Sequence, residues 1–216
     1  MTAPTSADPM APDVTLEGRT VRLVPLSLEH VPALLEAATV SRASYQWTPV
    51  PGTLAEMTTY VSNAIERAEA RQVVAFATTL RDSGRVVGST RFATFEFHAW
   101  PEGSPLAPPP GCPDVVEIGW TWLAGDMQRT AVNTEAKLLM LTHAFETWGV
   151  KAVRLKTDRR NERSHNAILR IGATFEGIIR AHSPGADGAL RDSAYFSILA
   201  EEWPPAQAAL EARLSR

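Results

Sequence analysis

Apolar residues along the chain switch between the two-residue period of a strand and the 3.6-residue period of a helix. Alternation predicts a first strand over residues 19–26. Ser27 is expected to cap the helix that follows, with His30 at its third position. A second helix is predicted over 54–70, where small and apolar residues recur every three or four positions. The first part of the chain is therefore expected to place one strand before two helices.

Two β-rich runs, 73–80 and 85–95, flank an Arg-Asp-Ser-Gly turn and predict an antiparallel hairpin. Residues 97–114 hold six of the sixteen prolines. Because proline lacks a backbone N–H, this segment is predicted to be neither helix nor central strand. An apolar strand is expected over 115–123. Since strands of one sheet are predicted on both sides, residues 97–114 are interpreted as an insertion loop.

The rest of the chain alternates between helices and strands. A long helix is expected over 132–148, with Gly149 as its stop, and a shorter one over 161–171. Further strands are predicted over 153–157, 173–182 and 193–199. Strand–helix–strand crossovers imply parallel pairing in the middle of the sheet, and hairpins imply antiparallel pairing elsewhere. The predicted fold class is a mixed α/β (α+β) fold, whose central sheet of about seven strands is flanked by helices.

At 216 residues the chain has the size of one domain. Its Ala/Pro/Thr/Ser-rich start predicts a disordered tail over 1–14, followed by a single domain over 15–204 and a helical tail over 205–216. The start lacks the basic and apolar regions of a signal peptide, and no apolar run is long enough to span a bilayer. A cytoplasmic location is therefore expected.

Charge and cysteine content limit the kinds of partner, disulfide and metal site that are expected for this chain. The 21 basic and 24 acidic residues give a net charge of −3 without a run of like charge, so neither nucleic acid nor a membrane surface is expected as a partner. A single cysteine, Cys112, excludes an internal disulfide and a multi-cysteine zinc site. The five histidines show no metal-ligand spacing, so no metal site is predicted.

The run from Gln128 to Glu135 joins the apolar strand 115–123 to the long helix. The first backbone N–H groups of a helix have no intrahelical partner, and the helix dipole favours negative charge there. A turn that brings small residues to such a helix start is a good anion site. The sequence thus predicts a turn that binds a phosphorylated cofactor.

Short motifs in a fixed order extend over residues 16–204. They are Leu16-Glu17-Gly18-Arg19, Val21-Arg22-Leu23, Gly88, Glu117 to Leu123, Gln128 to Lys137, Asn161-Glu162-Arg163-Ser164 and Ile171-Gly172-Ala173. In order and spacing they resemble the GNAT superfamily of acyl-CoA-dependent N-acyltransferases. Within it, the chain is similar to the ribosomal-protein N-acetyltransferases of the RimJ/RimL type.

The resemblance implies the GNAT fold, in which the fourth strand splays from the fifth and the pantetheine arm of acetyl-CoA lies between them. It also implies that the turn binds the pyrophosphate of the cofactor through backbone N–H groups. Ala131 and Asn133 stand at the glycine-type positions of the family pattern; alanine is small and asparagine tolerates unusual φ, so binding is expected to persist. The expected cofactor-binding residues are Gln128, Arg129, Thr130, Ala131, Val132, Asn133, Thr134, Asn161 and Asn166.

Acyl transfer to an amine needs a base for the amine and a proton for the departing thiolate. Glu117, on the splayed strand, is the expected base, acting through a water; the alternative is a purely structural glutamate. The resemblance implies that Ser164 lies near the thiol and either protonates or hydrogen-bonds the departing thiolate, whereas the alternative is a first-turn serine that satisfies a backbone N–H. Tyr195 lies late in the chain and receives no role. Cys112 is not expected to be catalytic, because the cofactor carries the activated acyl group.

The predicted function is acetyl-CoA-dependent acetylation of a primary amine by direct attack in a ternary complex. The acceptor is a protein N-terminus, a lysine side chain or a small molecule, bound by segments 45–51, 97–114 and 183–191. Two alternatives stay open: a small-molecule or antibiotic N-acetyltransferase, and a non-catalytic acyl-CoA-binding module. A homodimer is expected by analogy with relatives only. The sequence leaves the acceptor and the acyl chain length undetermined.

Overall fold

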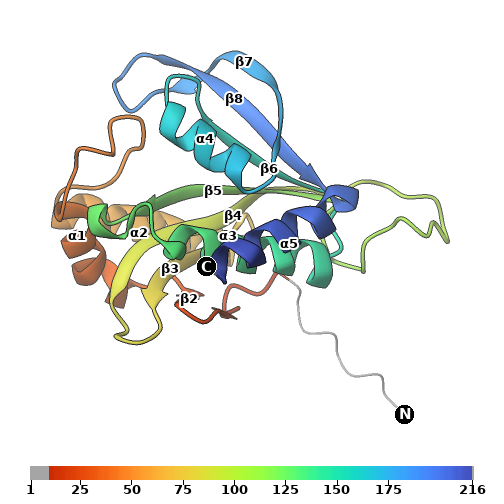
Figure 1. Cartoon of the computed structure of the whole chain (residues 1–216), viewed down its shortest axis with the longest axis horizontal. Helices are drawn as coiled ribbons and strands as arrows, with labels where there is room; N and C mark the ends of the chain where they lie inside the picture. The colour runs from red at the N-terminus through yellow and green to blue at the C-terminus, as the bar shows by residue number, and fades with distance from the viewer. Residues whose placement is uncertain (1–9, 216) are drawn as a thin grey trace.

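Eight strands form one mixed sheet in the computed structural model, which describes residues 10–215 (Figure 1). They are β1 (Leu16–Glu17), β2 (Val21–Pro25), β3 (Val73–Leu80), β4 (Val86–Glu96), β5 (Val115–Leu123), β6 (Ala152–Asp158), β7 (Thr174–Pro184) and β8 (Leu190–Leu199). Their order across the sheet is β1-β2-β3-β4-β5-β6-β8-β7, and only β5 and β6 pair in parallel. The predicted mixed fold is confirmed; the strand beyond the seven predicted is the two-residue β1.

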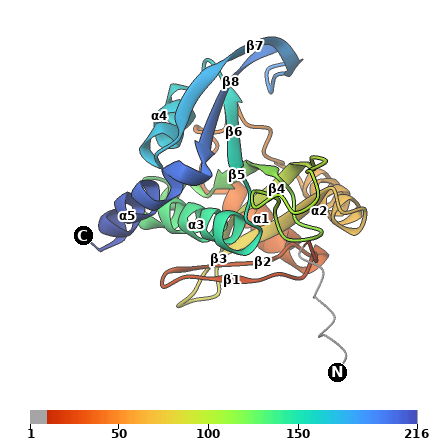
Figure 2. The ribbon, with the colours of Figure 1, turned by 90° about the vertical axis from the view of Figure 1, so that its right-hand side faces the viewer.

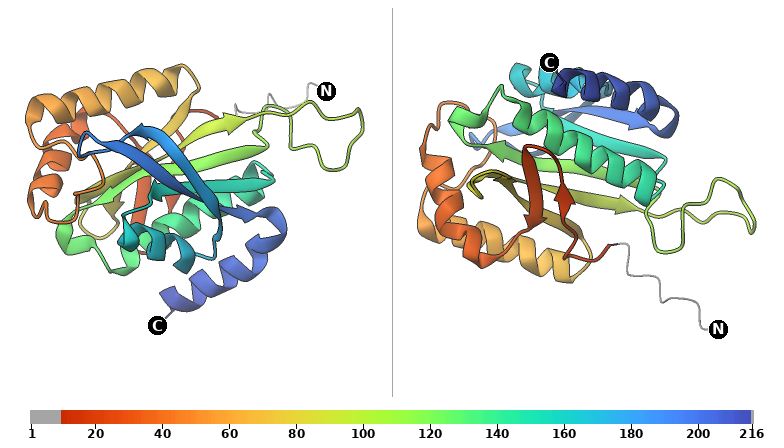
Figure 3. Two further views of the ribbon diagram at one scale, coloured as in Figure 1. Left: turned by 90° about the horizontal axis from the view of Figure 1, so that it is seen from above. Right: turned by 60° about the horizontal axis from the view of Figure 1, so that its bottom comes forward.

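Helices cover both faces of this sheet, as the left view of Figure 3 shows. On one face lie α1 (Val31–Thr39) and α2 (Leu54–Glu69); on the other lie α3 (Ala131–Thr142), α4 (Glu162–Arg170) and α5 (Trp203–Leu214). A five-residue π-helix, η3 (His143–Thr147), extends α3, so the predicted helix 132–148 is an α-helix with a π-helical end. Each face has its own core. Leu34, Met57 and Val61 belong to the core under α1 and α2, and Phe92, Met140 and Trp148 to the core under α3 and α5.

The strands β5 and β6 pair over three residues only. Val115, Val116 and Glu117 face Ala152, Val153 and Arg154, and no pairing follows beyond them. Past this point β6 leaves toward the part of the sheet formed with β8 and β7, while β5 continues beside β4 (Figure 2). These are the fourth and fifth strands predicted from the sequence, so the predicted splay between them is confirmed. The gap leaves one edge of β5 without a neighbouring strand in the middle of the sheet.

The β1–β2 turn is attached to α3 by the buried carboxylate of Glu135. Its Oε1 accepts the backbone N–H of Arg19 at 2.7 Å, and its Oε2 accepts those of Thr20 and Val21 at 2.7 and 2.8 Å. A Cβ at Gly18 would lie 2.6 Å from the Glu135 carboxyl carbon. The motif that contains Gly18 therefore serves the close approach of this hairpin to α3.

The proline-rich segment 97–114 projects from the end of the β4–β5 pair (Figures 1 and 3). Buried Asp114 fastens its base, because its carboxylate accepts the His98 backbone N–H at 2.6 Å and the Trp100 indole N–H at 2.5 Å. The segment joins two neighbouring strands of one sheet.

The chain ends differ in how they are placed. Of the tail predicted over 1–14, residues 1–9 lie outside the described part of the chain, while Met10 is buried. At the other end α5 includes most of the segment 205–216, and its Ala206 and Leu210 are buried in the core. No helix between residues 10 and 215 has the length and apolar character needed to cross a membrane.

Candidate active site

The free edge of β5 carries a bulge. Ser89 pairs with Trp122 and Arg91 with Gly119, so Trp120 and Thr121 together oppose the single residue Thr90. Trp120 adopts a φ of 51°, which few residues other than glycine adopt. A bulge turns the local backbone and interrupts the ladder, and bulges are common beside active sites. Here it lies where β5 has already parted from β6.

The turn before α3 forms the predicted helix start. Thr130 is the N-cap: its Oγ1 accepts the Val132 N–H at 3.3 Å and donates to the Met127 carbonyl at 2.8 Å. Ala131 is exposed, and Asn133 and Thr134 are half-buried. The side chain of Val132 is buried, so only its backbone faces the turn. Because the first turn of a helix offers N–H groups and a positive dipole end, this turn fits a pyrophosphate.

Gln128 has a different environment from its neighbours. Its Nε2 donates to Ser44 Oγ at 2.6 Å and to the Leu123 carbonyl at 3.0 Å, and its Oε1 accepts from Arg163 Nη1 at 3.1 Å. Arg163 also donates to the Ser44 carbonyl. The Gln128 side chain thus ties together the end of β5, the α1–α2 loop and α4. In this arrangement it braces the turn, whereas Arg129 next to it is exposed.

The first turn of α4 faces the turn before α3 across this brace. Buried Asn161 is the N-cap, and its Oδ1 accepts the Ser164 N–H at 3.0 Å. The Ser164 side chain is half-buried, and its hydroxyl makes no hydrogen bond to any other residue within 10–215. Asn166 is exposed on α4. Asn161 therefore caps the helix, and the Ser164 hydroxyl is free to bond a ligand.

Glu117 lies at the apex of the gap between β5 and β6. Its carboxylate is buried and lies 2.8 Å from the Lys156 ammonium, which β6 supplies. The Thr94 hydroxyl donates to the same oxygen at 3.4 Å. The ion pair gives the buried carboxylate a counter-charge, as a buried charge requires.

Three residues without a predicted role lie around this ion pair. Tyr195 pairs with Lys156 in the β6–β8 ladder, and its ring centroid lies 5.8 Å from the Lys156 ammonium. The Tyr195 hydroxyl is 3.1 Å from His182 Nε2, and His182 Nδ1 is 3.0 Å from Ser193 Oγ. Burial lowers the pKa of His182, and the positive charge of Lys156 lowers it further. The alternation of β6, which places the polar residues 154, 156 and 158 on one face, is a sequence signal for Lys156 but not for these three residues on β7 and β8.

Two of the three expected acceptor segments meet at the open end of the gap. Tyr45 donates its hydroxyl to the Leu123 carbonyl at 2.8 Å, which anchors the α1–α2 loop to the end of β5. Arg160 lies 4.1 Å from the Trp47 ring centroid and donates to Asp187 in the β7–β8 turn at 2.7 Å. The third segment, 97–114, lies at the opposite end of β5.

On the side of the bulge that faces α3, the described part of the chain buries a lysine without a carboxylate partner. Lys137 of α3 donates to Thr121 Oγ1 at 2.6 Å and to Thr90 Oγ1 at 3.3 Å. Burial lowers the pKa of this lysine to about 7. Among residues 10–215 it takes part in no ion pair.

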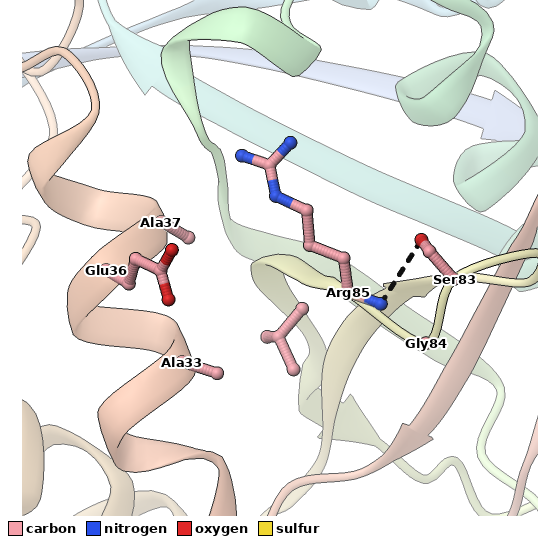
Figure 4. A pocket seen from close by; sticks show the side chains of 7 residues that line it. Ala33, Glu36, Ala37, Ser83, Gly84 and Arg85 are labelled. Atoms are coloured by element: carbon pink, nitrogen blue, oxygen red, sulfur yellow. Dashed lines mark hydrogen bonds between the residues drawn. The ribbon is translucent and has the colours of Figure 1, made fainter.

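Two other features contribute no site chemistry. Cys112 is buried in the core, and burial raises the pKa of its thiol, which disfavours the nucleophilic thiolate. A hollow of about 200 Å³ lies between α1 and the β3–β4 turn (Figure 4). It is lined by Ala33, Glu36, Ala37, Ser83, Gly84, Arg85 and Val86, and none of the predicted site residues reaches it. Within the described chain, no three His, Cys, Asp or Glu side chains gather as metal ligands would.

Comparisons with known proteins agree with this geometry. The family model of the GNAT acetyltransferase domain matches residues 20–174. An acetyltransferase from T. thermophilus is 33% identical, with a TM-score of 0.73 over 93% of this chain and 96% of that one. A GCN5-related N-acetyltransferase from Brucella melitensis is 29% identical, with a TM-score of 0.76 over 93% and 85%.

A further solved structure is similar at lower sequence identity, and that similarity shows the fold alone. Mycobacterium smegmatis RimJ, solved in complex with CoA-disulfide, is 20% identical, with a TM-score of 0.75 over 93% of this chain and 95% of that one. The comparison with curated proteins finds no match. Since the family model covers well over half of the sequence, the chain belongs to the GNAT family of acyl-CoA-dependent N-acyltransferases.

Proposed function

We propose that this protein acetylates a primary amine with acetyl-CoA, by direct attack of the amine within a ternary complex. The observation that supports this best is the placement of Glu117, a buried carboxylate at the apex of the gap between β5 and β6. A gap with an unpaired strand edge on one side and a carboxylate at its end suits a thioester and an attacking amine. The acceptor is a protein N-terminus, a lysine side chain or a small amine.

The described residues include a candidate contact for each part of the cofactor. The free edge of β5 beyond Glu117 can pair with the amides of a pantetheine arm as a further strand would. The first N–H groups of α3 and the exposed guanidinium of Arg129 suit the pyrophosphate. Asn161, Ser164 and Asn166 are proposed to contact the arm from the side of α4. When bound, acetyl-CoA supplies the acetyl group as an activated thioester.

Proton movements are assigned to two groups. Glu117 accepts the proton that the amine loses, through a bridging water, while Lys156 holds its carboxylate in place at 2.8 Å. As the C–S bond breaks, the Ser164 hydroxyl donates a hydrogen bond to the sulfur, or passes its proton to the thiolate and takes a proton back from water. The bulge at Trp120 lies on the free edge of β5, whose backbone N–H groups are proposed to bind the acyl oxygen.

Release of CoA thiol from acetyl-CoA, measured with a panel of amines, tests this function. The panel contains amino-terminal peptides, lysine peptides with blocked N-termini, and aminoglycosides. We expect acceptor-dependent thiol release that Glu117→Gln slows about a hundredfold or more, while calorimetry shows that the variant still binds CoA. Tight CoA binding without thiol release from any acceptor would support a non-catalytic acyl-CoA-binding module instead. Absence of CoA binding would refute the site assignment as a whole.

A further inference from the structure

Three positively charged side chains surround the indole ring of Trp120, which is 38% exposed on β5. The guanidinium carbon of Arg91 lies 5.2 Å from the ring centroid, that of Arg67 lies 5.8 Å away, and the Lys156 ammonium lies 6.0 Å away. They come from β4, α2 and β6 respectively. Like charges gathered around one ring repel one another unless anions join them.

The residues described, 10–215, supply an anion for only one of these cations. Lys156 pairs with Glu117 at 2.8 Å. Arg67 donates from Nε to the neutral side chain of Gln72 at 3.3 Å, and neither Arg67 nor Arg91 forms an ion pair with any described residue. Two positive charges beside Trp120 are therefore left without a counter-charge.

Arg91 is one of these two charges without a counter-charge, and it is buried. It is 3% exposed, and its Nε and Nη2 atoms have no hydrogen-bond partner among the described residues. Its guanidinium lies between two aromatic rings, 4.9 Å from the Tyr60 centroid and 5.2 Å from that of Trp120. Contact with the rings offsets part of the desolvation, but buried N–H groups still need an acceptor. The planar fork of a guanidinium matches a carboxylate or a phosphate.

We propose that the acceptor carries an anionic group, a carboxylate or a phosphate, that binds between Arg91 and Arg67 beside Trp120. This inference rests on the proposed function, because Lys156 contacts both Trp120 and Glu117 and so places the two sites side by side. Binding of the anion directs the amine of the same molecule toward Glu117. The positive surroundings also favour the neutral amine, which is the form that attacks.

Matched pairs of acceptors test the charge preference. Thiol release from acetyl-CoA is measured with the dipeptide amides Ser-Glu and Ser-Gln, and with phosphoethanolamine and ethanolamine. We expect a KM about tenfold lower for the anionic member of at least one pair. Whichever pair shows the larger difference identifies the anion as carboxylate or phosphate. Equal or better use of both neutral members overturns the proposal.

Variants link the preference to the cluster. Arg67→Gln changes an exposed residue, so it is expected to fold normally and to raise the KM for the anionic acceptor about tenfold, with the KM for its neutral partner and for acetyl-CoA unchanged. Arg213→Gln removes an exposed arginine of α5 as the matched control and is expected to change none of these values. If Arg67→Gln raises both acceptor KM values equally, the proposal is wrong.

A binding measurement separates this proposal from the proposed function. N-acetylglutamic acid α-amide and N-acetylglutamine α-amide have no free amine and differ only in the side-chain carboxylate, and their binding is followed by calorimetry and thermal melting with CoA present. Of these two ligands, we expect only the glutamic acid α-amide, which carries the carboxylate, to bind the wild type and to raise its melting temperature, and we expect it to do neither with Arg91→Gln. This result would support the anion site even if no amine is acetylated. If thiol release proceeds but the protein distinguishes neither the matched acceptors nor these ligands by charge, the proposed function is supported and the anion site is refuted.

Discussion

The carboxylate of Glu117 lies 2.8 Å from the ammonium of Lys156, and the strands that carry them part immediately beyond this contact. Glu117 is the last residue of β5 that pairs with β6. The Glu117 side chain is 4% exposed and that of Lys156 is 22% exposed, so the ion pair has one buried and one partly hydrated end. The lysine thus supplies the counter-charge that a buried carboxylate needs at the closed end of the gap.

Replacing Glu117 is expected to lower kcat more than replacing Lys156. Glu117→Gln should lower kcat about 10²- to 10⁴-fold, the usual effect of losing a general base, with the Kd for CoA unchanged. Lys156→Gln should lower kcat less, because the base remains but loses its partner. Steady-state kinetics of the double variant is the decisive measurement: we expect it to be no slower than Glu117→Gln. Full additivity of the two effects would mean that Lys156 acts independently of Glu117.

Lys137 should make stability depend on pH. Its folded pKa of about 7 lies below the ordinary value of 10.5, so between these limits the unfolded state holds the proton that the folded state has lost. Stability therefore rises as pH increases from 7 to 10, by up to about 1.4 kcal/mol per pH unit from this group. Below pH 7 both states are protonated, and the cost of the buried ammonium is present in full.

Urea unfolding of the wild type and Lys137→Met at several pH values between 6 and 10 measures this contribution. We expect the variant to be more stable than the wild type near pH 6 by more than it is at pH 10. Lys151→Met, at a partly exposed lysine, serves as the control and should give a curve parallel to that of the wild type. A constant difference between Lys137→Met and the wild type across this range would contradict the assignment.

The sequence predicted the elements whose pattern is local. The strand predicted over 115–123 matches β5 at both ends. Ser27, expected to cap the helix that follows, is the N-cap of a three-residue 3-10 helix, Leu28–His30, that leads into α1, and its backbone N–H donates to His30 Nδ1 at 3.1 Å. The strand β1 was missed because two residues have no periodicity, and they are held by their pairing with β2. The π-helical end of α3 was also missed, since π-helix leaves no periodic signal in so short a segment.

The site was predictable only where it lies on one continuous segment. The turn over 128–134 could be located because a helix start follows a strand there. Lys156, Tyr195 and His182 meet because β8 inserts between β6 and β7 in the sheet, and strand order is not readable from periodicity. Tyr195 received no role on account of its late position in the chain, yet it lies beside the Glu117–Lys156 pair.

The contact between Gly18 and Glu135 should make Gly18→Ala destabilising. A Cβ at this position would lie 2.6 Å from the Glu135 carboxyl carbon, and the carboxylate cannot move away without losing its three backbone hydrogen bonds. We expect a loss of about 1–3 kcal/mol, measured by urea unfolding. Glu135→Gln should lose a comparable amount, because one of its two terminal atoms becomes a donor facing N–H groups. The double variant should lose less than the sum, and strict additivity would mean that the two residues do not constrain each other.

Arg129 allows cofactor binding and backbone strain to be separated at one position. It adopts a φ of 62° in the turn before α3, where glycine would be unstrained, and its side chain is exposed. Both Arg129→Gly and Arg129→Ala remove the guanidinium, so both should raise the Kd for CoA, by about three- to thirtyfold for one charged phosphate contact. Only the alanine variant keeps the strain, so the glycine variant should be the more stable of the two by about 1 kcal/mol in urea unfolding.

Calorimetry with CoA and with dephospho-CoA then indicates which phosphate Arg129 contacts. Equal loss of affinity for both ligands points to the pyrophosphate, and loss for CoA alone points to the 3′-phosphate. An unchanged Kd in both variants would show that Arg129 makes no cofactor contact and that its side chain is ordinary solvated surface.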